Sequence, residues 1–300
     1  NLLTQLRRET AACTAVLPYV LRRGCTRLPD PEAIAAELDG LGGARVTPAV
    51  RKCGEIQSIG FDAEFADDGA LGEDVFPRLA ADIADLLLHP NTRGGLLRPD
   101  VVDSEREQLL ARIRAAANDE RTYLRERLYA HMCCCEDFAV PRLGEESGAE
   151  RIHYRRLTMR YHDLLASSPV EIFYCGSIDG KRAARILTDA FSTMPRGVLD
   201  EDIGTDIRMN ALEEQPRYVT ETLPGAQTRL AVGYRLGTCM EDPDLPALFV
   251  LNALYGGGAA SKLFLSLHER LGLCSTVGSQ LDTHKGLLTV TGGIDADDHE

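Results

Sequence analysis

Histidines and cysteines are the residues of this sequence that could bind a metal ion, and their spacing argues against such a site. The seven histidines lie at positions 89, 131, 153, 162, 268, 284 and 299. No two are four residues apart, the spacing that places two imidazoles on one face of a helix. His131 precedes three consecutive cysteines, Cys133 to Cys135. Because adjacent helical side chains point in different directions, we interpret these as three thiols packed on a helix.

Two other motifs that could perform chemistry are incomplete. The glycines at 256–258 precede Ser261 and Lys262, but they lack the Gly-x-x-x-x-Gly-Lys-Ser/Thr spacing of a phosphate-binding loop. We interpret this run as a glycine-rich helix start. Ser275 lies outside any Gly-x-Ser-x-Gly turn, which would expose a serine nucleophile. Neither motif therefore predicts an enzyme class.

Composition narrows the class of protein. The 300 residues include 46 acidic and 33 basic side chains, for a net charge of −13, and this excess argues against nucleic acid as a partner. The longest apolar stretch, Leu245 to Tyr255, contains Pro246 and Asn252 and is too short to cross a bilayer. We therefore expect no membrane partner. The nine cysteines are odd in number and mostly scattered, which indicates reduced thiols and a cytoplasmic protein.

The elements that would position a site are helices and short strands. The pattern predicts a helix over 2–23 with a kink at Pro18, and a second helix capped by Asp30 that ends near Gly40. Strands are expected over 44–51 and 55–65, joined by a turn at Gly54. Further helices are expected over 72–88, 99–117, 120–132, 157–166 and 180–191, and a further strand over 170–175.

The second half of the chain repeats this order after an acidic stretch at 200–217. Strands are expected near 218–223, 227–234, 274–280 and 286–293, and helices over 242–254 and 260–271. Duplication of one α+β domain would explain the repeat. We therefore predict an α+β protein of two related domains, 1–204 and 205–300, each an antiparallel-rich sheet packed against helices. The second domain is expected to be truncated, because it stops just after its hairpin.

Several segments carry a family resemblance. They are LPYVLRRG at 17–24, LDGLGGA at 38–44, VVDSERE at 101–107, LYGG at 254–257 and SKLF at 261–264. In order and spacing they resemble the inverzincin zinc peptidases, which include insulinase, pitrilysin and the mitochondrial processing peptidases. The resemblance covers essentially the whole chain, and it is closest to bacterial members that have lost the metal motif. It implies a clamshell fold built from related halves.

Active members of that family carry His-x-x-Glu-His on a helix, where the histidines bind Zn²⁺ and the glutamate acts as general base. The resemblance places the first histidine on Tyr19, the base on Arg22 and the second histidine on Arg23. Two guanidinium groups would repel a divalent cation. Only Glu105 matches a ligand position, that of the glutamate supplied by a second helix. We therefore expect no catalytic residues and no bound zinc, although the family would imply that cofactor.

The family's substrate-binding residues are changed as well. An arginine and a tyrosine of the active members fall on His268 and Ser275. We therefore predict a catalytically inactive subunit that pairs with an active homologue, or with itself, to form a chamber for a peptide substrate. An exposed sheet edge in either half could hold the peptide by strand addition. Two alternatives remain: an active zinc endopeptidase with misread ligands, which needs a His-x-x-Glu-His that the chain lacks, and a structural assembly subunit.

The one surviving ligand position gives a structural prediction. If the fold is kept, Glu105 points at the former metal cavity, toward Arg22 and Arg23 on the facing helix. A buried carboxylate without a partner is costly, and a guanidinium can meet it with two parallel hydrogen bonds. We expect Arg23, or Arg22 as second choice, to lie where the zinc would be. The alternative is that both arginines face solvent.

Overall fold

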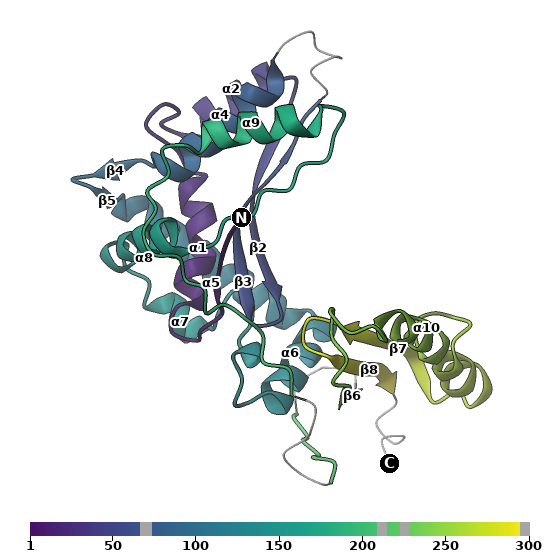
Figure 1. The fold of residues 1–300 in the computed structure, drawn as a ribbon. Coiled ribbons are helices and arrows are strands. Elements are labelled where there is room, and N and C mark those ends of the chain that lie inside the picture. Colours follow the sequence, from purple (N-terminus) through teal and green to yellow (C-terminus); the bar gives the residue numbers. More distant parts are fainter. Residues whose placement is uncertain (67–73, 209–214, 223–227, 295–300) are drawn as a thin grey trace. The chain divides into compact units, whose positions relative to one another are not determined.

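The structure, a computed structural model, describes residues 1–66, 74–208, 215–222 and 228–294 (Figure 1). The chain forms two compact units. The first comprises Asn1–Arg114 and Val140–Ile203, and the second comprises Ala115–Ala139 and Gly204–Glu300. Both combine helices with an antiparallel sheet, which confirms the α+β prediction. The segment Ala115–Ala139 leaves the first unit and packs with the second, an arrangement that the sequence pattern did not indicate.

The first unit is built on a three-stranded antiparallel sheet. Its strands are β1 (Leu2–Gln5), β2 (Arg45–Cys53) and β3 (Ile56–Glu64), in the order β1-β3-β2. A two-residue turn joins β2 to β3, and its Gly54 has a φ of 61°, a left-handed conformation that glycine adopts without strain. The predicted hairpin is therefore confirmed, and β2 is an edge strand of the sheet.

Helices surround this sheet, and α1 (Ala11–Leu21) is the most deeply buried of them. The others are α2 (Pro31–Gly40), α4 (Val75–Leu88), α5 (Pro99–Asn118), α7 (Glu146–Glu150), α8 (Tyr154–Ser167) and α9 (Gly180–Ala190), with a short hairpin of β4 (Thr92–Arg93) and β5 (Leu96–Leu97). Leu17 of α1 shares a core with Leu109 of α5 and Leu157 of α8. As predicted, the Asp30 side chain caps α2, accepting a 2.8 Å hydrogen bond from the backbone N–H of Ala33.

The second unit repeats the connectivity of the first. It contains α6 (Glu120–Met132), the 3₁₀ turn η1 (Asp137–Ala139), β6 (Arg229–Arg235), α10 (Leu245–Tyr255), the π-helix η2 (Phe264–Arg270), β7 (Cys274–Asp282) and β8 (Leu287–Ile294). Its sheet order is β6-β8-β7. In both units one strand, two helices and a hairpin follow in sequence, and the last strand lies in the middle of the sheet. This shared topology confirms the prediction of two related domains.

Four predicted elements differ from the structure. Residues 2–5 form β1 rather than the start of a helix, because they pair with β3. The strand expected over 170–175 is reduced to a bridge between Val170 and Leu2, since β1 offers backbone partners only as far as Asn1. Residues 218–222 are not a strand, and 223 lies outside the described residues. The helix expected over 260–271 is largely the π-helix η2, whose Leu271 N–H bonds the Ser266 carbonyl five residues back.

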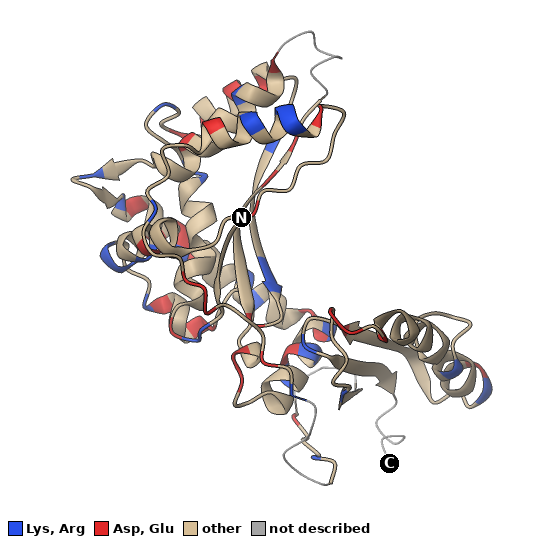
Figure 2. Ribbon diagram, viewed as in Figure 1, with Lys and Arg blue, Asp and Glu red and all other residues tan. Residues whose placement is uncertain are grey.

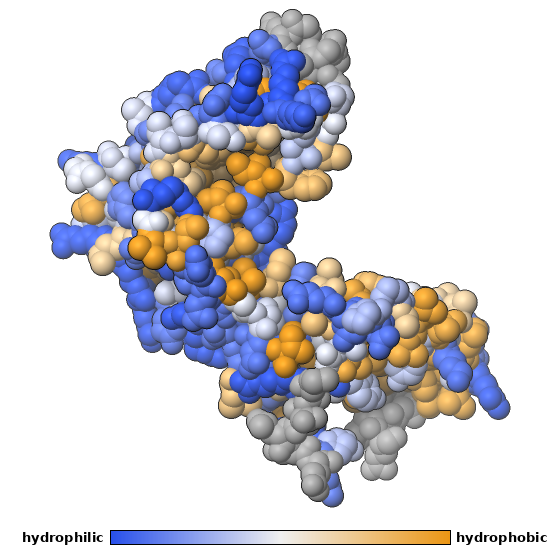
Figure 3. Space-filling view, viewed as in Figure 1, coloured by the Kyte–Doolittle hydropathy of each residue, from blue (hydrophilic) through white to orange (hydrophobic). Residues whose placement is uncertain are grey.

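The helix α10 differs from α1 in its surroundings. It contains no charged residue, and Leu245 is its buried side chain, whereas Phe249, Val250 and Leu254 are more than half exposed. The ribbon of α10 is tan in Figure 2, the colour of uncharged residues, and Figure 3 shows apolar side chains gathered over this part of the second unit. No helix in the described ranges is long and apolar enough to cross a membrane.

Candidate functional site

The three residues that the family resemblance places at the motif positions lie together at the end of α1. Tyr19, Arg22 and Arg23 are spaced as i, i+3 and i+4, which places them on one side of a helix. Arg22 caps the helix, and its backbone N–H bonds the Pro18 carbonyl. The end of α1 therefore brings these three residues close together, and their side chains then take different partners.

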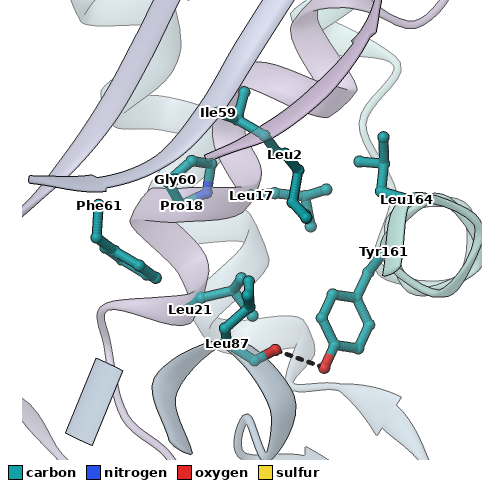
Figure 4. Close-up of a pocket in the computed structure, with 10 residues that line it drawn as sticks. All are labelled: Leu2, Leu17, Pro18, Leu21, Ile59, Gly60, Phe61, Leu87, Tyr161 and Leu164. Atoms are coloured by element: carbon teal, nitrogen blue, oxygen red, sulfur yellow. Dashed lines mark hydrogen bonds between the residues drawn. The ribbon is translucent and has the colours of Figure 1, made fainter. Parts of the chain in front are cut away.

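The other side of α1 lines a small apolar pocket (Figure 4). Leu17, Pro18 and Leu21 face Leu2 and Ile59 of the sheet across it. On its far side the Tyr161 hydroxyl donates a 2.8 Å hydrogen bond to the Leu87 carbonyl. Burial raises the pKa of this tyrosine, so the hydroxyl stays protonated. The lining contains no charged side chain, and the pocket is part of the packing beneath the site rather than the site itself.

Glu105 lies in α5 and is only 2 % exposed. Its Oε1 accepts a 2.6 Å hydrogen bond from Arg23 Nε and a longer one, 3.3 Å, from Gln108 Nε2. The prediction that Arg23 lies against the former ligand position is therefore confirmed. The bond runs through Nε instead of the two parallel bonds expected from a guanidinium edge.

The second carboxylate oxygen faces a residue that the sequence argument missed. Arg112 Nη2 lies 3.7 Å from Glu105 Oε2, beyond hydrogen-bonding range, and Oε2 has no hydrogen-bond partner among the described residues. The Arg112 guanidinium lies over the Tyr19 ring, 3.8 Å from its centroid, in a cation–π contact. Gln108 and Arg112 follow Glu105 by three and seven residues, a spacing that places all three on one face of a helix. This spacing could have predicted that both residues lie near Glu105.

Arg22 turns away from Glu105. Its Nε donates a 2.8 Å hydrogen bond to the backbone carbonyl of Val46 on β2. Burial lowers the pKa of Arg22 from its ordinary value, but an arginine stays charged at neutral pH. Arg22 therefore contributes a fixed positive charge and a donor to the sheet edge, and Arg23 alone of the two meets the carboxylate.

These residues do not fit a zinc ion. Structural and catalytic zinc sites use imidazole, thiolate and carboxylate ligands, whereas α1 presents a phenol and two guanidinium groups. Glu105 Oε1 is already bonded to Arg23. Within the part of the chain that the structure describes, no three His, Cys, Asp or Glu side chains gather as a metal site. No step of metal catalysis can be assigned to this arrangement.

The predicted substrate positions lie in the second unit and bond to backbone. His268, in η2, has its Nδ1 2.8 Å from the carbonyl oxygen of Cys274. Ser275 Oγ donates a 3.4 Å hydrogen bond to the Gly293 carbonyl. Both side chains thus link η2 and β7 to their neighbours in the same unit, which is a structural use of the two positions.

The cysteine run does not converge on one point. Cys133 is buried, and its Sγ accepts a 3.6 Å hydrogen bond from Arg235. Cys134 and Cys135 are exposed, with their sulfur atoms 3.8 Å apart. His131 Nε2 lies 2.9 Å from the Glu221 carboxylate. The prediction of three thiols packed on a helix is wrong, because α6 ends at Met132 and the three cysteines follow it in a turn.

Comparison with known proteins shows which family this chain is similar to. Residues 151–300, half of the chain, match the family model described as "Peptidase M16 inactive domain". A "Probable inactive metalloprotease YmfF" from Bacillus subtilis is 28% identical over the whole of this chain and 70% of its own length.

Solved structures agree on the fold. A conserved protein from Enterococcus faecalis is 24% identical with a TM-score of 0.86, covering 99% of this chain and 69% of that one. A peptidase M16 inactive domain from Pseudomonas fluorescens is 17% identical with a TM-score of 0.70, covering 98% and 68%. The sequence match and the shared fold agree, and this chain belongs to the M16 peptidase family.

Proposed function

We propose that this chain is a catalytically inactive subunit that pairs with an active homologue and helps to form a chamber for peptide substrates. The observation that carries the proposal is the 2.6 Å bond between Arg23 Nε and Glu105. It puts a side-chain cation of the chain itself on the one carboxylate that matches a zinc-ligand position. Peptide hydrolysis in such a complex would come from the partner.

Two further features support the proposal. The substrate-binding positions His268 and Ser275 are changed along with the motif, while the described part of the chain keeps a fold shared with M16 structures. A protein that keeps the fold of a peptidase family without its catalytic residues is expected to function by binding other proteins or peptides. The name of the Bacillus subtilis relative is consistent with this role. We place the protein in the cytoplasm, because an odd number of mostly scattered cysteines is typical of reduced thiols.

Coexpression with a homologue that carries His-x-x-Glu-His tests the proposal. We expect one heterocomplex in size-exclusion chromatography, with faster peptide hydrolysis than the homologue alone. Replacing the motif glutamate of the homologue by glutamine should abolish hydrolysis and leave the complex intact, because the general base is then lost without a change in shape.

Other outcomes would contradict it. Separate elution with unchanged hydrolysis would exclude the pairing. A large assembly without proteolysis would favour a structural subunit, and a complex that stays active with the mutated homologue would favour zinc ligands that we have misread.

A further inference from the structure

The edge of β2 lies next to the degenerate motif, because Arg22 reaches it. β2 is an outer strand of the sheet. Its two-residue turn makes Cys53 and Ile56 a hydrogen-bonded pair. Along an antiparallel ladder, hydrogen-bonded pairs alternate with non-hydrogen-bonded pairs, whose backbone groups point away from the partner strand. With the observed register, Val46, Pro48 and Val50 belong to the other kind of pair. Their backbone groups therefore point away from β3, toward the position of a strand added to the edge.

Two of these outward carbonyls are already bonded to arginine. Val46 O accepts the 2.8 Å hydrogen bond from Arg22 Nε. Val50 O accepts a longer one, 3.4 Å, from Arg142 Nη1. An added peptide strand would need these carbonyls as acceptors for its own N–H groups. The Arg22 side chain thus occupies the position of the first of those N–H groups.

The outward position between these two valines is a proline. Pro48 has no N–H, so it cannot donate a hydrogen bond to an added strand. Three successive outward positions on β2 have each lost a group that strand addition requires. Charged side chains and proline are the devices by which proteins protect sheet edges from further pairing.

The opposite edge of the same sheet is covered by the chain itself. The Leu3 N–H bonds the Pro169 carbonyl at 2.9 Å, and the Glu171 N–H bonds the Asn1 carbonyl at 2.9 Å. Residues 169–171 therefore run along the outer side of β1. Both edges of the first sheet have intramolecular partners for part of their length.

We infer that Arg22, Pro48 and Arg142 close the edge of β2 to extended peptides, so that this unit does not hold a peptide by strand addition. Arg22 contributes more to closing this edge than Arg142 does, because it makes the shorter of the two hydrogen bonds. The consequence for a complex rests on the proposed function. There the peptide would be held by the partner's sheet, and this unit would form a wall of the chamber.

Hydrogen exchange on the purified chain tests the closed edge. The probe is a fluorescein-labelled library of unstructured, random-sequence 15-residue peptides. The Val46 and Val50 amides face outward, so an added strand would protect them. In the wild-type chain we expect their exchange to be unchanged by the peptides. Protection of either amide in the wild-type chain would overturn the inference.

An opened variant, Arg22→Ala with Pro48→Thr, provides the converse test. It frees one carbonyl and restores one N–H, so peptide affinity by fluorescence polarisation should rise about tenfold, with both outward amides protected. The control Arg45→Ala removes an exposed arginine that lies on β2 itself, and this variant should bind as wild type does. Unchanged affinity in the opened variant would overturn the inference.

The test also separates folding and pairing from edge closure. Inward amides of β3 report whether the opened variant keeps the sheet. If these amides show that the opened variant has lost the sheet, the single variant Arg22→Ala is tested instead. Its peptide affinity should rise about threefold. The measurements need no homologue, so failure to form a heterocomplex would contradict the proposed function and leave this result standing.

Discussion

Both units bury carboxylates against cations, and the clusters around Glu136 and Glu105 differ in how completely they are bonded. In the second unit, Glu136 has a side chain that is 2 % exposed. Arg235 donates to its Oε1, and Lys285 Nζ lies 2.6 Å from its Oε2. Lys285 is fully buried. In the first unit, Glu105 is as buried, but its main partner Arg23 is 38 % exposed and its Oε2 is unbonded among the described residues.

This difference distinguishes a fully bonded ion cluster from a partly bonded one. Glu136 precedes η1, while Arg235 ends β6 and Lys285 precedes β8. The cluster therefore fastens the segment Ala115–Ala139 to the sheet of its unit, and complete bonding is what a buried network needs to stabilise a fold. Glu105 instead matches a zinc-ligand position by family resemblance. Its Oε1 is bonded to Arg23 and its Oε2 is unbonded among the described residues.

The largest effect should come from restoring the motif. The variant Tyr19→His, Arg22→Glu, Arg23→His would offer two imidazoles and Glu105 to a zinc ion. We expect near-stoichiometric zinc in this variant by elemental analysis, and neither zinc nor peptide hydrolysis in the wild-type chain. Stoichiometric zinc in the wild-type chain, with hydrolysis that a chelator stops, would contradict the assignment of Arg23 as the replacing cation.

The next effect should come from breaking the complete cluster. Glu136→Ala leaves Lys285 and Arg235 without their carboxylate, and Lys285 has no exposure to water. Stranding a buried charge costs about 3–5 kcal/mol of unfolding free energy. Hydrogen exchange of β8 amides measures this loss in the second unit. The exposed control Glu241→Ala should change little, and equal effects of the two variants would count against the cluster.

Arg23→Ala should cost less than Glu136→Ala. Arg23 is 38 % exposed, so solvent already screens part of its interaction, and Gln108 still donates to Glu105 Oε1. We expect a loss of about 2 kcal/mol, the scale of one hydrogen bond to a charged group. Urea unfolding monitored in the first unit measures it, with Arg45→Ala as control. A loss as large as that of Glu136→Ala would show that the two clusters are equivalent.

Local sequence signals predicted much of the fold. The Asp30 cap, the Gly54 hairpin and the helices over 99–117 and 120–132 depend on residues close in sequence, and all were confirmed. The Arg23–Glu105 bond was also predictable, because the family resemblance implies that the helix ending near Arg23 and the helix carrying Glu105 face each other.

Features set by tertiary contacts were not predictable in the same way. β1 is short and its pattern suits a helix, and only pairing with β3 makes it a strand. The bonds from Arg22 and Arg142 to β2 depend on where three distant segments meet. The cluster around Glu136 joins residues far apart in the sequence, so the packing of Ala115–Ala139 with the second unit had no local signal.

Acid should weaken the second unit through its bonded carboxylates. Burial raises the pKa of Glu136, but the hydrogen bonds from Arg235 and Lys285 outweigh it and lower the pKa from 4.5. Hydrogen bonds from Arg127 and His131 lower the pKa of Glu221 from 4.5 to about 2.

Groups with lowered pKa values contribute stability that is complete above the unfolded-state pKa and is lost as the pH falls through the folded-state value. We therefore expect β8 amides to lose protection progressively from about pH 4.5 toward pH 2. The slope should be smaller in Glu136→Gln, and an unchanged slope would show that Glu136 does not contribute to it.

The smallest effect should come from removing both partners of the first-unit pair. Arg23→Met with Glu105→Leu replaces two charges by apolar side chains of similar length, so the carboxylate is not left buried without its cation. Replacing a buried ion pair in this way is often neutral, and we expect a change below about 1 kcal/mol in urea unfolding.

The double variant, together with the single variants Arg23→Met and Glu105→Leu, gives a coupling energy that isolates the pair. Arg112 loses the carboxylate that lies 3.7 Å from its Nη2, so the cycle is repeated in an Arg112→Met background. If the double variant were as unstable as Arg23→Ala, the cost would come from packing around α5 and not from the stranded carboxylate. Arg23 would then stabilise the first unit through packing, and the difference in bonding between the two clusters would not explain the difference in stability.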